Sequence, residues 1–208
     1  MIKIDVGAAN AKINDSDNIH LLFEPSTDDY IKLCCKYVNL PNVFVFDNAL
    51  WDKKEHLLLN ICKKQECSSV FEPDKQVISS FTGQWSNTDR FEIVKKVPTM
   101  AHPLKDILDT IIPQLKTMGM SEEELKISEL KIDTQGSEYE ILLGMGDYLN
   151  DVQQLICEVE FEPIYKGQKL FEDVKQHVHN YGLEFIKHKR EVSWGRPVFA
   201  DAIFERVK

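Results

Sequence analysis

Short apolar runs alternate with amphipathic stretches along the chain, and most of the runs end at a glycine, a proline or a polar residue. Runs of this length with such boundaries are typical of buried strands. In the first part of the chain the predicted strands cover residues 2–6, 19–25 and 42–50. Between the second and the third, residues 27–40 carry apolar side chains at helical spacing, and Thr27, Asp28 and Asp29 suit a helix N-terminus. A strand, a helix and a strand in this order predict a parallel sheet with right-handed crossovers.

The middle of the chain is less regular. Residues 56–61 and 90–97 have the apolar character of strands, and a long polar stretch separates them. We interpret them as a hairpin with a long, functional loop, within an irregular insertion at about residues 56–102. Residues 103–115 are amphipathic at helical spacing, and we expect Pro113 to kink or end that helix.

The alternation of strands and helices resumes in the last third of the chain. Strands are predicted at residues 129–133 and 154–163, and helices at residues 137–145 and 169–182. Ser137 and Glu140 have the spacing of a capping box at the start of the first helix. Residues 183–189 and 197–206 read as two closing strands joined by a short turn around Trp194–Gly195. Strands joined so closely pair in the antiparallel sense.

Composition and charge narrow the classes of function. The chain has 208 residues, 43% hydrophobic and 28% charged, which fits one globular domain over residues 1–208. Its net charge of −9 at pH 7 argues against nucleic acid as the main partner, because an acidic surface repels phosphates. No apolar segment approaches the roughly 20 residues that span a bilayer, so we expect no membrane partner.

Cysteine usage and the N-terminus predict the compartment. The 5 cysteines are scattered and form no C-x-x-C pair, which predicts free thiols and no cysteine zinc site. The first residues lack the charged region and the long apolar run of a signal peptide. Both observations predict a cytoplasmic protein.

Acidic residues gather at the predicted strand ends. In an open parallel sheet, ligands bind beyond the carboxyl ends of the strands. The predicted ends begin at Asp5, Glu24, Asp47, Asp133 and Glu158. Gly7 lets the backbone approach a ligand closely, and an acid at the end of the second strand is the usual acceptor for ribose hydroxyls. Glu24 follows Gly7 at close to the spacing of about 20 residues found in dinucleotide-binding folds.

The first turn does not suit a pyrophosphate. The dinucleotide fingerprint G-x-G-x-x-G supplies backbone donors from three glycines, whereas this turn has Gly7 alone, followed by Ala9, Asn10, Ala11 and Lys12. Acids at several strand ends oppose a pyrophosphate but favour a sulfonium and an ammonium group. A cationic nucleoside without phosphates therefore fits better than a nicotinamide dinucleotide.

Five successive motifs resemble those of FkbM-type methyltransferases. They read IDVGAAN, LLFEPS, VFDNALWDKK, LKIDTQGSEYEILLGM and EVEFEPIYKGQKLFEDV, and their order and spacing match from Ile2 to about Phe185. The KIDTQGSEYEILLG block is the most specific of them. The closing hairpin is also similar to that of the class I methyltransferase sheet. The resemblance implies an α/β, Rossmann-like, mostly parallel sheet with helices on both faces and a C-terminal antiparallel hairpin.

The resemblance also implies roles for individual residues. S-adenosyl-L-methionine would be the cofactor, with Asp5, Gly7 and Asn10 beside its methionine part and Glu24 on its ribose. Residues 47–49 would flank the adenine. The full set of implied cofactor-binding residues is Asp5, Gly7, Ala8, Asn10, Glu24, Pro25, Asp47, Asn48, Ala49 and Asp133.

The implied reaction is methylation of a hydroxyl on a small molecule, a sugar or a glycan, with nitrogen as an alternative acceptor atom. A hydroxyl must lose a proton to a nearby base. Asp133 is the first candidate for that base, because it would lie near the methyl group. Glu138, Glu160 and His102 are the further catalytic candidates.

Other functions stay open at this point. Residues 7–18 are near the minimum length for a helical crossover, which leaves room for a non-catalytic domain that has lost its cofactor. An NAD-dependent oxidoreductase is the third class. The carboxylates of residues 158–162 offer oxygen ligands for Mg²⁺ or Ca²⁺, although we expect no metal site. A short crossover with no preceding segment also predicts an open pocket, which makes a homodimer a reasonable expectation.

Overall fold

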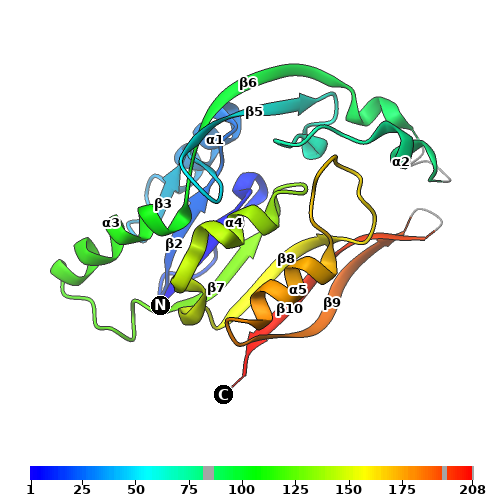
Figure 1. Cartoon of the computed structure of the whole chain (residues 1–208). Coiled ribbons are helices and arrows are strands. Elements are labelled where there is room, and N and C mark those ends of the chain that lie inside the picture. The colour runs from blue at the N-terminus through cyan, green and yellow to red at the C-terminus, as the bar shows by residue number, and fades with distance from the viewer. Residues whose placement is uncertain (82–86, 194–195, 208) are drawn as a thin grey trace.

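The computed structural model describes residues 1–81, 87–193 and 196–207. Its main element is a seven-stranded sheet with the strand order β3-β2-β1-β7-β8-β10-β9 (Figure 1). Neighbouring strands from β3 to β8 pair in the parallel sense, and β10 is antiparallel to both β8 and β9. The strands are β1 Ile2–Val6, β2 Ile19–Phe23, β3 Val43–Phe46, β7 Ile127–Ile132, β8 Gln154–Glu160, β9 Leu183–Ser193 and β10 Pro197–Arg206. The predicted parallel sheet with a closing antiparallel hairpin is confirmed, while the turn at Trp194–Gly195 lies outside the described residues.

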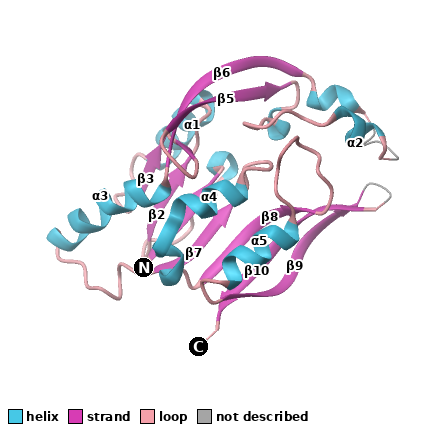
Figure 2. Cartoon of the chain, in the orientation of Figure 1, coloured by secondary structure: helices cyan, strands magenta, loops and turns pink. Residues whose placement is uncertain are grey.

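Helices cover the two faces of this sheet. Helix α1 (Thr27–Tyr37) joins β2 to β3, and α4 (Glu138–Met145) joins β7 to β8. These two crossovers step outward in opposite directions, so right-handed connections place their helices on opposite faces. Successive side chains of β2 therefore pack on opposite faces of the sheet. Leu22 belongs to the same cluster as Leu33 of α1, whereas Leu21 belongs to the larger cluster that includes Leu142 of α4. Figure 2 shows α4 and α5 (Phe171–His179) lying in front of the sheet.

A second, three-stranded sheet forms most of the predicted insertion. Its strands are β4 Ala49–Leu50, β5 Glu55–Cys62 and β6 Ile93–His102, in the order β4-β6-β5. Strands β5 and β6 pair in the antiparallel sense, which confirms the predicted hairpin. The connection between them contains η2 (Gln65–Cys67), α2 (Lys75–Ser79) and η4 (Thr88–Phe91), with residues 82–86 outside the described part. We call residues 49–102 the roof, because β5 and β6 pass over the carboxyl ends of the parallel strands (Figure 1).

Several local predictions need correction. The strand expected at residues 42–50 is divided, because the chain leaves the main sheet after Phe46 and joins the roof at Ala49. The helix α3 (Leu104–Thr117) continues past Pro113 to Thr117. The connection from β1 to β2 contains only the short η1 (Ala8–Asn10) and no α-helix, as the length of that crossover predicted.

The predicted capping box at the start of α4 is wrong. Ser137 precedes the helix but makes no side-chain cap, and its hydroxyl lies 2.9 Å from the hydroxyl of Thr134. The carboxylate of Glu138 instead accepts hydrogen bonds from the preceding loop. Among the described residues, no helix combines the length and the apolar character needed to cross a membrane.

Candidate functional site

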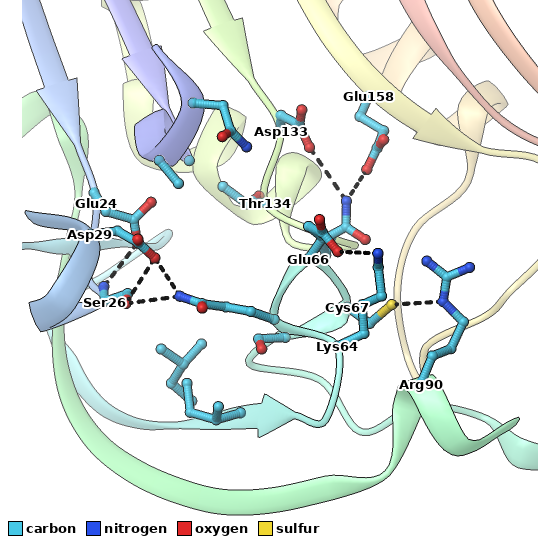
Figure 3. Close-up of a pocket in the computed structure, with 18 of the residues that line it drawn as sticks. Glu24, Ser26, Asp29, Lys64, Glu66, Cys67, Arg90, Asp133, Thr134 and Glu158 are labelled. Atoms are coloured by element: carbon cyan, nitrogen blue, oxygen red, sulfur yellow. Dashed lines mark hydrogen bonds and ion pairs between the residues drawn. The ribbon is translucent and has the colours of Figure 1, made fainter. Parts of the chain in front are cut away.

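A cavity of about 680 Å³ lies between the carboxyl ends of the parallel strands and the roof. This volume is within the roughly 300–1,000 Å³ of small-molecule pockets. We call the ends of β1, β2, β7 and β8 and the loops after them the floor. Figure 3 shows floor residues Glu24, Asp133 and Glu158 facing roof residues Lys64, Cys67 and Arg90 across this space. The roof belongs to the same chain, so residues of this chain form both sides of the pocket.

Gly7 sits where the strand order reverses, between the ends of β1 and β7. A reversal point of this kind is the usual ligand site of an open α/β sheet. Gly7 has φ 78°, and a Cβ atom at this position would lie 1.9 Å from the carbonyl oxygen of Asp133. Only glycine therefore permits the two strand ends to approach so closely. The approach is reinforced by the amide of Asp133, which donates to the carbonyl of Val6 at 3.0 Å.

Glu24 places a nearly buried carboxylate at the end of β2. Its side chain lines the pocket and accepts a hydrogen bond from the amide of Ser26 at 2.9 Å. Burial raises the pKa of Glu24, and the hydrogen bond from Ser26 opposes that rise. The fixed carboxylate is suited to accept hydrogen bonds from a diol.

Asp133 and Glu158 bring two carboxylates together at the other end of the floor. The side-chain amide of Gln135 donates to Asp133 Oδ1 at 3.3 Å and also to Glu158 Oε2. Arg190 donates to the other oxygen of Glu158 at 3.2 Å and to Asp201 at 3.1 Å. Burial raises the pKa of Glu158 well above its usual range, and the charges of Asp133 and Glu138 add to this while Arg190 opposes it. Both carboxylates line the cavity, where a general base must lie within hydrogen-bond reach of the proton it removes.

Glu138 shapes the loop that carries Gln135. One of its oxygens accepts from the amide of Thr134 at 2.7 Å and from the Thr134 hydroxyl at 3.0 Å, and the other accepts from the amide of Gly136 at 2.9 Å. Burial raises the pKa of Glu138 to about 7, although these hydrogen bonds favour the ionised form. Glu138 is buried and does not line the pocket, so the structure gives it a supporting position.

The roof meets the floor through few polar contacts at the α1 side. Gln65 donates through its amide to the carboxylate of Asp29 and, at 3.4 Å, to the hydroxyl of Ser26. Next to it, the Arg90 guanidinium donates to the sulfur of Cys67 at 3.3 Å (Figure 3). The roof contributes both apolar and cationic side chains to the pocket, whereas the floor contributes mainly carboxylates.

The structure gathers five of the thirteen sequence-predicted site residues around this cavity. They come from the ends of three strands, and they are Gly7, Asn10, Glu24, Pro25 and Asp133. They lie on one face of one pocket rather than on separate surfaces.

The remaining predicted residues lie elsewhere. Asp5 forms an ion pair with Lys131 at 3.0 Å, and Ala8 is fully buried below the first turn. Residues 47–49 lie where the chain passes from β3 of the main sheet to β4 of the roof. Glu160 is buried at the end of β8, and His102 pairs with Leu50 at the end of β6. The predicted residues that do not line the pocket are Asp5, Ala8, Asp47, Asn48, Ala49, Glu138, Glu160 and His102.

Most of the other pocket residues were not predicted as site residues, and they include Gln65, Arg90, Gln135 and Arg190. Gln65 lies in the long polar stretch that the sequence analysis interpreted as a functional loop, and Arg90 is the first residue of the strand predicted after it. Gln135 stands beside a predicted catalytic acid, but its left-handed backbone is not visible in the sequence. Within the described ranges 1–81, 87–193 and 196–207, no group of three or more His, Cys, Asp or Glu side chains is placed to hold a metal ion.

Comparison with known proteins agrees with this geometry. Residues 5–185 match the methyltransferase FkbM domain, and the chain belongs to this family of methyltransferases. The fold is similar to that of the methyltransferase FkbM from Methylobacillus flagellatus KT, with a TM-score of 0.51 and 11% sequence identity. The match covers 96% of this chain but only 43% of that protein, so this chain spans less than half of its length. No curated protein matches the sequence.

Proposed function

We propose that the protein transfers a methyl group from S-adenosyl-L-methionine to a hydroxyl of a small-molecule or carbohydrate acceptor. The observation that carries this proposal is a single covered pocket that joins Gly7, Glu24 and Asp133 at the reversal point of the sheet. Family membership supports the methyl transfer, and the chemistry of the pocket supports the choice of donor.

The floor fits a cationic nucleoside. Glu24 is available to a ribose diol, and the backbone around Gly7 approaches the cavity without a side chain in the way. The carboxylates of Glu24, Asp133 and Glu158 favour a sulfonium and an ammonium group and oppose phosphates. The cationic lining residues Lys64, Arg90 and Arg190 come from the roof and from β9, away from the first turn.

The acceptor would bind at the opposite end of the pocket. Val192 and Phe199 provide apolar surface there, close to the carboxylates of Asp133 and Glu158. When bound, the cofactor supplies an electrophilic methyl group. Asp133 would accept the proton of the acceptor hydroxyl, while the pocket walls hold that hydroxyl in line for displacement at about 3–3.5 Å.

Calorimetry with S-adenosyl-L-methionine, its demethylated product and NAD tests the proposal. S-adenosyl-L-homocysteine, the demethylated product, should bind with a dissociation constant tighter than about 100 µM, and NAD should not bind. Failure of all three ligands to bind would identify an inert domain, and binding of NAD alone would identify an oxidoreductase. Release of the product nucleoside in the presence of a panel of polyols, sugars and phenols would then identify the acceptor class.

A further inference from the structure

Gln135 has a backbone conformation that its residue type disfavours. It is the only non-glycine residue with a positive φ in the described part of the chain, at 61°, and it lines the pocket. A non-glycine residue in the left-handed region costs of the order of 1 kcal/mol or more and persists only where its surroundings enforce it. Gly136, with φ 102°, completes the same tight turn. The turn therefore retains a glutamine at a position that glycine would occupy with less strain.

The left-handed backbone of Gln135 places its side chain between two acids and a tyrosine. Its Nε2 atom faces Asp133 and Glu158, and its Oε1 atom accepts from the hydroxyl of Tyr165 at 3.3 Å. The amide orientation is set chemically, since an ionised carboxylate such as that of Asp133 only accepts hydrogen bonds. A single amide thus occupies the space between two acids and a phenol.

The main chain of Gln135 is fixed as firmly. Its carbonyl accepts from the hydroxyl of Ser69 in the roof at 2.7 Å. Tyr165 reaches the roof as well, with its hydroxyl 3.1 Å from the carbonyl of Cys67. Gln135 is therefore held from both ends by groups that do not belong to the sheet.

The two carboxylates differ in a way that assigns their roles. The Glu158 side chain is 4% exposed and has both oxygens engaged, by Arg190 and by Gln135. The Asp133 side chain is 32% exposed and faces the cavity, with Lys131 at 3.9 Å. Glu158 is thus buried and held by its two partners, whereas Asp133 is the carboxylate that an acceptor can reach.

We propose that Gln135 is a positioning residue that holds the Asp133 carboxylate toward the acceptor and keeps it ionised beside Glu158. This inference rests on the proposed methyl transfer. In the reaction the bond from sulfur to the methyl carbon breaks, the bond from the acceptor oxygen to that carbon forms, and the hydroxyl proton passes to Asp133. The sulfonium becomes a neutral thioether. Without the amide donor, the like charges of Asp133 and Glu158 would act on each other with no donor between them, so the pair would take up a proton more readily and Asp133 would be a poorer base.

Two substitutions separate this role from a purely structural one. Gln135→Gly removes the amide but suits the left-handed backbone, so the fold should be retained or stabilised. Gln135→Glu keeps the size of the side chain but replaces the donor with an acceptor. Both variants should bind S-adenosyl-L-homocysteine within about threefold of the parent, because Gln135 lies at the acceptor end.

The decisive measurement is a carbon-13 NMR titration of the ligand-free protein labelled at Asp and Glu carboxyl carbons. The apparent pKa of the Asp133 and Glu158 pair should rise by about 0.5 unit or more in both variants, with Asp133→Asn identifying the resonances. Once an acceptor is known, kcat should fall about 10- to 100-fold while KM for the donor stays constant. An unchanged titration of the pair in both variants would overturn the proposal. This result is independent of product binding by the parent, which tests the methyltransferase function itself.

Discussion

The floor and the roof of the pocket are built in different ways. The floor consists of strand ends in a sheet whose core side chains are fully buried, as Ile4 and Leu130 illustrate. The roof is a narrow sheet with large exposed apolar side chains, including Leu58 at 51% and Val94 at 61% exposure. The groups that would bind and deprotonate substrates are therefore fixed by the larger core, while the roof covers them with a thinner layer that has less packing to hold it.

The two sides of the roof are also attached differently. Beside the acceptor end, backbone bonds connect Asp74 with Ile164 and Lys166 with Glu72, each at 2.8 Å. At the α1 side the attachment is the exposed side chain of Gln65. Exposed side-chain hydrogen bonds contribute little and break easily, so this margin of the roof should separate from the floor first.

The largest effect should follow from Gly7→Ala. The added methyl would collide with the Asp133 carbonyl at 1.9 Å and would hold alanine at a disfavoured φ of 78°. We expect a loss of about 3 kcal/mol or more in the free energy of unfolding, together with loss of product binding. Urea denaturation and calorimetry measure both.

Gly119→Ala is the matched control for this change. Gly119 also has a positive φ, of 95°, but nothing lies within 4 Å of an added Cβ. It should lose only about 1 kcal/mol from backbone strain and should keep product binding. Equal losses in the two variants would show that the approach of β1 to β7 is not the tight contact described here.

Glu138→Gln should have the next largest effect. The amide carries two donors where the protonated carboxyl carries one, and a donor against the amide of Gly136 should cost about 1–3 kcal/mol of stability near pH 5. The pKa of Glu138 is raised to about 7, so the folded parent binds more protons than the unfolded chain between about pH 4.5 and 7. Its stability therefore falls as the pH rises through this window.

The glutamine variant lacks this titration, so its stability should depend less steeply on pH and the gap to the parent should narrow toward pH 7. Denaturation curves at several pH values would measure this. A gap that widens with pH would contradict a raised pKa at Glu138.

Glu24→Gln should act on binding rather than on stability. A neutral amide is a weaker partner for a ribose diol than a carboxylate, so product affinity should fall about 10-fold while the fold is retained. Asp28→Asn, a nearby exposed acid outside the pocket, should bind as the parent does. Equal affinity of the Glu24 variant would remove this residue from the cofactor site.

The smallest change in stability should come from Gln65→Ala. We expect less than about 0.5 kcal/mol, because the affected hydrogen bonds are exposed. The product nucleoside should nevertheless dissociate several-fold faster in stopped-flow experiments, since the roof loses its contact with Asp29 and Ser26. Gln76→Ala, an exposed glutamine on α2, should change neither quantity, and an unaltered dissociation rate for Gln65→Ala would show that this margin does not limit exit.

The floor could be predicted from the sequence because each of its residues is marked by the few residues before it. Gly7, Glu24 and Asp133 each follow an apolar run, and the geometry of parallel sheets brings such ends together. The roof could not, because its docking depends on contacts between distant residues, such as Gln65 with Asp29. The same reason explains why Asp47 and His102 are outside the pocket: the sequence shows where a strand ends but not which sheet it joins.

The exposed side-chain attachment at Gln65 has a consequence for the order of events in a catalytic cycle. A nucleoside that enters and leaves past helix α1 would do so without disturbing Gln135 or the two acids beside it. The donor would then be replaced at one margin while an acceptor with several hydroxyls stays bound at the other. Such an arrangement would favour repeated modification of one molecule before its release.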